Sequence, residues 1–429
     1  MVTLPAGTRL LHIGPHKTGT TTVQAAFHQN RAALGAQGVH YAGSTGHPMV
    51  AAMAAATGKA LATSQLSAGM ERWRELVEEV AASQARATVV SSEFFSEAPP
   101  ERIRDILDDL DAERTHVVVT LRPIIRILAS QWQQYMQNRP AIKYDDSLGY
   151  EEWLDAILNH PAERAVTPSF WKRHRHDELI RTWADVVGAD RMTVVVVDES
   201  DKRMLLRSFE EMLDLTEGTL EPRELSSNRS LTLAEVQMLR AFNRRYLDRG
   251  WSTADYTRFV RFGAVRVLQE RRPGADEPRL LTPQWAVDRG AEIGAEMVEA
   301  IRATGVEVVG DLGLLADPSV AVGVGDNPSD VRVPVEVVAR FTAGLVKLVA
   351  ETPGSAPSES RTVGELEALV RREKRGRQAE RNLARNEARI ERARERLSRM
   401  HGVDELTTGQ ILRVVAGRVG RRALRTVRR

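Results

Sequence analysis

The chain has 429 residues, of which 42% are hydrophobic and 28% charged, as is typical of a globular protein. It contains no cysteine, which excludes disulfides, thiolate metal sites and a cysteine nucleophile, and its 10 histidines include no H-E-x-x-H pattern, so we expect no metal site. The sequence has neither an apolar run long enough to cross a membrane nor a signal-peptide pattern at its start, so we expect a cytoplasmic protein.

The net charge of +2 is unevenly distributed. Residues 361–429 contain 20 Lys or Arg against 9 Asp or Glu, a net charge of +11, so the residues before them are net acidic. The basic character of the chain therefore belongs to its C-terminal tail.

The first predicted element is a short strand that leads through a tight turn into a helix. Leu10 to Ile13 is an apolar run, Gly14-Pro15 ends it, and helical spacing of apolar residues begins at Thr20. The first amides of a helix have no partner within it and point outward with the positive end of the helix dipole. This turn is therefore predicted to bind an anion.

The residues of the turn suit a phosphate or sulfate group. Gly19 removes a Cβ where the anion would approach, Lys17 adds a positive charge, and the threonines offer hydroxyl groups. The nucleotide-binding pattern G-x-x-x-x-G-K-[ST] does not fit, because the lysine precedes the glycine here. The residues expected to bind the anion are His16, Lys17, Thr18, Gly19, Thr20, Thr21 and Thr22.

Strands and helices alternate along the next hundred residues. Short apolar strands are predicted at 38–41, 87–92 and 115–121, and amphipathic helices at 70–83 and from Pro100 onward. The strand at 115–121 is apolar throughout its middle, which is typical of a parallel sheet buried on both faces. We therefore predict an α/β fold with a central parallel sheet flanked by helices, whose ligands bind at the carboxyl ends of the strands.

The strand at 115–121 is followed directly by Arg122 and Pro123, and Ser130 lies two helical turns further on. A guanidinium can hold a phosphate through two hydrogen bonds, and a serine hydroxyl can complete its shell. The alternative is that Arg122 only caps the edge of the sheet and that Ser130 is an ordinary helix residue.

These two elements together resemble motifs of the sulfotransferases that use 3′-phosphoadenosine 5′-phosphosulfate (PAPS). The order from Lys17 to Thr21 is similar to their 5′-phosphosulfate loop, K-[ST]-G-T-[TS]. The interval from Arg122 to Ser130 is similar to their 3′-phosphate element, R-x-P-x-x-R-x-x-S, although Pro123 follows Arg122 without the intervening residue. The resemblance covers residues 9–245 by motifs rather than by continuous similarity.

The resemblance implies a P-loop NTPase-like sulfotransferase fold, with PAPS as the sulfuryl donor and no metal. It implies in-line transfer to a hydroxyl or amine of a carbohydrate, lipid or metabolite, with Lys17 neutralising charge and Glu93 as the catalytic base. His47 and His16 are the alternative bases, because the cytosolic animal members use a histidine. Arg229 is a second candidate for the 3′-phosphate, or else a surface arginine before a helix.

Four regions are predicted along the chain: an α/β core at 1–250, a helical or irregular continuation at 251–352, a linker at 353–361 and a basic helical tail at 362–429. The linker is rich in Pro, Ser and Gly, and the tail ends in a basic amphipathic pattern. Besides a small-molecule or glycan acceptor, we expect a second copy of the chain or the inner membrane face as the partner of this tail, and no nucleic acid.

Two other functions stay open from the sequence. One is a P-loop-type nucleotide kinase or NTPase, which the position of Lys17 disfavours. The other is a non-catalytic protein that binds a nucleotide or glycan and assembles through its basic tail. The sequence does not identify the acceptor.

Overall fold

The computed structural model of the protein describes residues 3–60, 65–142, 144, 148–161, 166–167, 169–221 and 229–350. The chain divides into two compact units, Met1–Glu351 and Thr352–Arg429, and all described residues belong to the first. The predicted linker and basic tail therefore lie outside the described residues.

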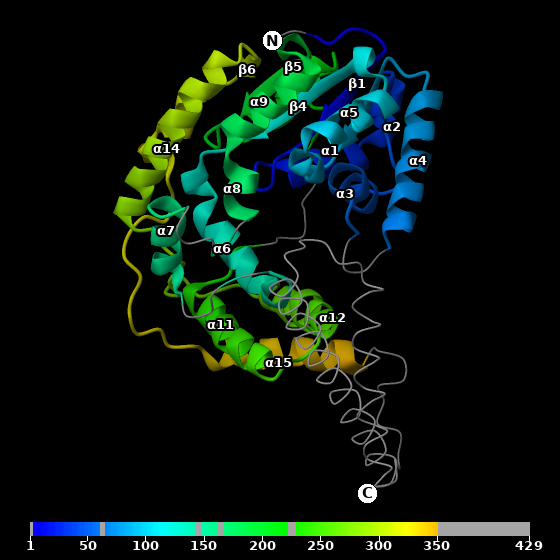
Figure 1. Cartoon of the computed structure of the whole chain (residues 1–429). Helices are drawn as coiled ribbons and strands as arrows, with labels where there is room; N and C mark the ends of the chain where they lie inside the picture. Colours follow the sequence, from blue (N-terminus) through cyan, green and yellow to red (C-terminus); the bar gives the residue numbers. More distant parts are fainter. Residues whose placement is uncertain are drawn as a thin grey trace, which may run out of the picture. The chain divides into compact units, whose positions relative to one another are not determined.

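A six-stranded sheet forms the centre of the first unit (Figure 1). All its strand pairs are parallel, and their spatial order is β2-β3-β1-β4-β5-β6. The strands are β1 (Thr8–His12), β2 (Val39–Tyr41), β3 (Ala87–Ser91), β4 (Thr115–Leu121), β5 (Met192–Val196) and β6 (Glu307–Val309). The predicted central parallel sheet flanked by helices is confirmed.

The strand order places β1 between β3 and β4, so the connection from β3 to β4 crosses over β1. Leu10 pairs in register with Val89 on one side and with His116 on the other. In open parallel sheets, ligands bind at the carboxyl ends of the strands, at the point where the direction of the connections reverses. The turn after β1 lies at such a point.

Successive strand residues point to opposite faces of the sheet, and each face is buried under helices. Leu11 and Val90 belong to the larger of two apolar clusters, whereas Leu10 and Val89 belong to the smaller one. Burial on both faces explains why these strands have near-continuous apolar sequences.

Helices cover the two faces unequally. The smaller cluster lies under α1 (Thr20–Gln29), α2 (Arg31–Ala36) and α10 (Met204–Met212). The larger cluster includes residues of α3 (Met49–Thr57), α4 (Leu66–Ala82), α5 (Pro100–Asp109), α6 (Leu128–Gln137), α7 (Tyr150–Leu158), α8 (Ser169–His174), α9 (His176–Val187), α11 (Leu233–Asp248), α13 (Val265–Gln269), α14 (Gln284–Ala303) and α15 (Val335–Ala350). In Figure 1, α11, α12 (Thr253–Asp255) and α15 lie together away from the strands.

The sheet takes its sixth strand from a region for which the sequence predicted helices and irregular structure. β6 pairs with β5 through three residues only, from Thr193↔Glu307 to Val195↔Val309. A strand of three residues is too short to produce a recognisable period of two in the sequence. The same region also contains the 20-residue helix α14.

Helix α14 packs closely against the 3₁₀ helix η7 (Leu312–Ala316), which follows β6. A Cβ atom on Gly294 would lie 2.0 Å from the carbonyl oxygen of Leu315, so this contact requires a glycine. The neighbouring Gly290 similarly faces Ile125, since its Cβ would lie 2.6 Å from Ile125 Cγ2. Helix α14 thus supports both the β6 region and the segment after β4.

Replacement of Gly294 by Ala should lower the free energy of unfolding by about 2 kcal/mol or more, because a methyl group there must displace backbone. Urea unfolding measures the change. Gly35→Ala in α2 is the matched control, since its Cβ would have no atom within 4 Å, and there we expect no loss of stability. Equal stability of Gly294→Ala and the wild type would contradict the close contact.

Candidate anion-binding site

The turn between β1 and α1 has an unusual backbone. Gly14, Lys17 and Gly19 have φ angles of 80°, 69° and 96°, a region that favours glycine. A Cβ on Gly14 would lie 2.8 Å from Glu93 Cα, and a Cβ on Gly19 would lie 2.7 Å from Leu205 Cδ2. The two glycines therefore let the turn contact β3's end on one side and α10 on the other.

The threonines of the turn divide into two pairs. The hydroxyl groups of Thr18 and Thr20 both donate to the carbonyl oxygen of Pro15, at 2.7 and 3.2 Å, and both side chains are buried. Thr21 is exposed and Thr22 is half-buried. Thr18 and Thr20 thus stabilise the turn itself, and Thr21 and Thr22 are the ones accessible to a ligand.

A buried polar network ties the turn to the sheet. The Nδ1 atom of His12 lies 2.8 Å from Ser91 Oγ and its Nε2 atom 3.2 Å from Thr120 Oγ1, which in turn lies 2.9 Å from Thr18 Oγ1. His12 is fully buried, and burial lowers its pKa to about 3, so the ring is neutral. The network joins the ends of β1, β3 and β4.

Glu93 begins the 3₁₀ helix η1 (Glu93–Glu97) directly after β3. Its Oε2 atom accepts a hydrogen bond from Gln24 Nε2 at 3.2 Å and lies 3.3 Å from His47 Nε2. The same His47 nitrogen lies 2.8 Å from Ser92 Oγ, and the ring stacks on Phe94. The predicted base Glu93 and the alternative base His47 are therefore neighbours.

The charge of Glu93 affects the pKa values of both Lys17 and His47. Burial lowers the pKa of Lys17 to about 8, although the negative charge of Glu93 opposes this. Burial also lowers the pKa of His47, and Glu93 again opposes the shift. Lys17 therefore loses its proton just above neutral pH.

The other alternative base, His16, belongs to a separate ion cluster. Its Nε2 atom lies 3.0 Å from Glu97 Oε1, and the Nε atom of Arg173 donates to the same oxygen at 2.9 Å. Burial raises the pKa of Glu97, but His16, Arg173 and the more distant Lys172 outweigh this effect and lower it to about 2. Glu97 thus holds His16 at the side of the turn.

Arg122 connects the turn with the segment after β5. Its Nη1 atom donates to the carbonyl oxygen of Lys17 at 3.4 Å, and its Nη2 atom pairs with the carboxylate of Glu199. Arg126 pairs with the other oxygen of Glu199 and donates to the carbonyl oxygen of Val320 at 3.1 Å. The predicted phosphate ligand Arg122 therefore already has an anionic partner within the chain.

Ser130 lies on α6, one helical turn after the 3₁₀ helix η3 (Ile124–Arg126). Its hydroxyl donates to the carbonyl oxygen of Ile127 at 3.0 Å, and the side chain is half-buried. Its role as a phosphate ligand stays a prediction.

Arg229 lies before α11 and is fully engaged there. Its guanidinium makes two hydrogen bonds of 2.7 Å to the buried Glu235 and also donates to the carbonyl oxygens of Leu268 and Arg271. Glu235 completes a capping box with Thr232 at the start of α11. These bonds give Arg229 a structural task, and its binding of a phosphate stays a prediction.

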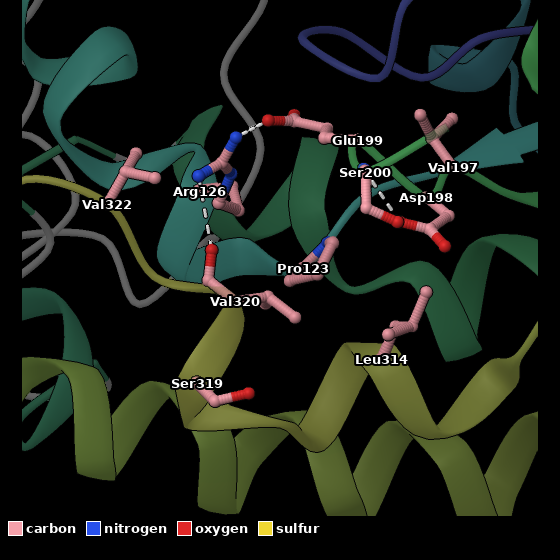
Figure 2. Close-up of a pocket in the computed structure, with 10 residues that line it drawn as sticks. All are labelled: Pro123, Arg126, Val197, Asp198, Glu199, Ser200, Leu314, Ser319, Val320 and Val322. Atoms are coloured by element: carbon pink, nitrogen blue, oxygen red, sulfur yellow. Dashed lines mark hydrogen bonds and ion pairs between the residues drawn. The ribbon is translucent and has the colours of Figure 1, made fainter. Parts of the chain in front are cut away.

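A cavity of about 400 Å³ opens at the carboxyl end of β5, beside Arg126 and Glu199 (Figure 2). Its apolar walls come from the ends of β4 and β5 and from the segment after β6. The lining residues are Pro123, Arg126, Val197, Asp198, Glu199, Ser200, Leu314, Ser319, Val320 and Val322. The volume is at the lower end of the range of small-molecule sites.

The structure thus brings together Lys17, Glu93, His47 and Arg122 at the ends of three adjacent strands. The sequence did not reveal Glu199 as the partner of Arg122, because the two residues are far apart in the chain. Within the described residues, no three His, Asp or Glu side chains are placed to hold a metal ion together, and no helix has the length and apolarity to cross a membrane.

No protein-family model matches the sequence, and no curated protein matches it. Among solved structures, the chain is similar to a crystal structure of a sulfotransferase from Alicyclobacillus acidocaldarius. The two chains are 14% identical, with a TM-score of 0.34 over 60% of this chain and 100% of that one. At this TM-score the likeness carries no weight for the function of this chain.

The network around His12 predicts an acid-labile fold. Because the pKa of His12 is lowered on folding, its neutral form contributes stability above about pH 6.5 that is lost as the pH falls toward 3. His12→Gln should therefore reduce the loss of stability between pH 7.5 and pH 5 by about 2 kcal/mol. Urea unfolding at both pH values measures this loss.

His160→Gln is the matched control, since this side chain is 43% exposed whereas that of His12 is fully buried. It should lose as much stability on acidification as the wild type does. An unchanged acid dependence in His12→Gln would contradict a neutral, buried His12.

Proposed function

We propose that the protein is a sulfotransferase that moves a sulfuryl group from PAPS to a hydroxyl or amine of a carbohydrate, lipid or other metabolite. The observation that carries the proposal is the convergence of the turn after β1, a carboxylate and an arginine at the ends of β1, β3 and β4. Lys17 is linked to Arg122 through its carbonyl group and is close enough to Glu93 for the charge of Glu93 to affect its pKa.

These residues would share the work of an in-line displacement. The donor supplies a sulfuryl group on a good leaving group, so the protein has to position the reactants and neutralise charge. Lys17 and the first amides of α1 would neutralise the charge that develops on the 5′-phosphate oxygen as its bond to sulfur breaks. Arg122 would bind the 3′-phosphate.

Glu93 would accept the proton of the acceptor as the new bond to sulfur forms. Its carboxylate is held by Gln24 and lies beside His47, so its orientation is fixed before an acceptor binds. His47 would keep the carboxylate in place, and it remains the alternative base. The cavity beside Arg126 would hold the adenosine part of the donor, since its walls are largely apolar and Arg126 and Glu199 line it.

Lys17→Ala should weaken the binding of adenosine 3′,5′-bisphosphate at pH 7 by about tenfold or more, because a charged hydrogen-bond donor is lost. In the wild type the affinity should also fall as the pH rises from 7 to 9, since Lys17 has a pKa of about 8. Isothermal calorimetry measures both effects, and the variant should lack the second.

Lys347→Ala, at an exposed position of α15, is the matched control and should bind like the wild type. Wild-type binding by Lys17→Ala would refute the assignment of the turn. A preference of the wild type for ATP with Mg²⁺ would instead support a nucleotide kinase or NTPase.

Glu93→Gln should keep the affinity for adenosine 3′,5′-bisphosphate but slow the transfer of radiolabelled sulfate from PAPS to a panel of acceptors by about 100-fold, the usual effect of losing a general base. His47→Gln is the informative comparison. If His47→Gln abolishes transfer and Glu93→Gln does not, the histidine is the base.

A further inference from the structure

Beside the cavity at the end of β5, the carboxylate of Glu199 lies between the guanidinium groups of Arg122 and Arg126. Arg122 and Arg126 each bind one carboxylate oxygen of Glu199 through Nη2. The Nη1 atom of Arg122 donates to the carbonyl oxygen of Lys17, and that of Arg126 donates to the carbonyl oxygen of Val320. The exposed fractions of the three charged side chains are 31%, 14% and 27%. Figure 2 shows Arg126 reaching both Glu199 and Val320.

A carboxylate between two guanidinium groups occupies the position that a phosphate would take. Carboxylate and phosphate oxygens accept the same pairs of guanidinium hydrogen bonds. Arg122 therefore cannot bind a phosphate with its Nη2 group while Glu199 holds it. An incoming phosphate carries up to two negative charges against the single charge of Glu199, so it can replace the carboxylate.

The side chain of Glu199 is placed so that it can move away from the two arginines. It lies three residues beyond the end of β5 and is followed by the exposed Ser200, so its side chain can turn toward solvent without a change in the sheet. Arg126 is more constrained, because it donates to the carbonyl oxygen of Val320 and belongs to η3, against which α14 packs.

We propose that Glu199 competes with the 3′-phosphate of the donor for Arg122 and Arg126 and so weakens the binding of ligands that carry this phosphate. The proposal rests on the function proposed above. A nucleotide without a 3′-phosphate leaves Glu199 in place and gains nothing from the arginines. A nucleotide with one displaces Glu199 and binds both of them, so its affinity is reduced by the free energy of the two ion pairs that it has to break.

Calorimetric titration of the full chain with adenosine 3′,5′-bisphosphate and with 5′-AMP tests the proposal. Glu199→Gln should bind the bisphosphate about tenfold more tightly than the wild type, because an uncharged amide competes weakly with a phosphate. It should bind 5′-AMP with unchanged affinity. Glu199→Asp, whose shorter side chain cannot span both arginines, should bind the bisphosphate with intermediate affinity.

Glu336→Gln is the matched control, because it removes the same charge from an exposed ion pair with Arg340 on α15. It should leave both affinities unchanged. Weaker or equal binding of the bisphosphate by Glu199→Gln, or an equal gain for 5′-AMP, would overturn the competition while leaving the proposed function intact. If neither the wild type nor Glu199→Gln binds the bisphosphate, the proposed function fails and the competition fails with it.

Discussion

The imidazole of His12 holds together the three strands on which the candidate site is built. As a neutral ring it can donate to one hydroxyl, on Ser91 or Thr120, and accept from the other, so both of its nitrogens are satisfied away from water. The hydroxyl group of Thr120 also contacts that of Thr18, which lies in the turn between β1 and α1. A shift of β1 by one residue would turn His12 to the other face of the sheet, so the network also fixes the register.

The basic groups around the turn each lie beside a carboxylate. Glu93 lies near Lys17, Glu97 holds His16 and Arg173, and Glu199 holds Arg122 and Arg126. The three carboxylates come from segments that follow β3 and β5. Basic side chains that would repel one another at the edge of the sheet are thus paired within the protein. An anionic ligand that binds there has to displace these carboxylates, because the basic side chains are already paired with them.

Much of the fold could be predicted because burial on both faces leaves a strong local signal. The strand at 115–121 coincides with β4, and the helix at Pro100 starts where α5 does. The turn was also recognisable, since Lys17, Gly19 and the threonines are consecutive in the chain. The sequence could not reveal the contact of Glu199 with Arg122, the place of the three-residue β6, or the bonds of Arg229 to Glu235.

The physical reasons for these failures differ. A carboxylate that binds an arginine at the end of the neighbouring strand leaves no periodic trace in the sequence, and many acidic residues could have done so. Gly14 and Gly19 differ from this case, because the two glycines themselves indicated a turn. The residues that leave no room for a side chain there, Glu93 and Leu205, could not be predicted from the sequence. Local patterns thus located the turn, whereas the contacts that give it a chemical environment depend on the packing of the whole unit.

The hydrogen bond from Arg126 to Val320 has a consequence for the modularity of the protein. Residues before 250 contain every candidate ligand of the donor, yet one wall of the cavity and the support of η3 come from residues 290–322. The part of the chain that carries the candidate site is therefore not separable from the residues that follow it. A fragment that ends at 250 would carry the recognisable motifs but would lack β6, α14 and the carbonyl group that anchors the second arginine, and any smaller version of the protein has to extend past Val322.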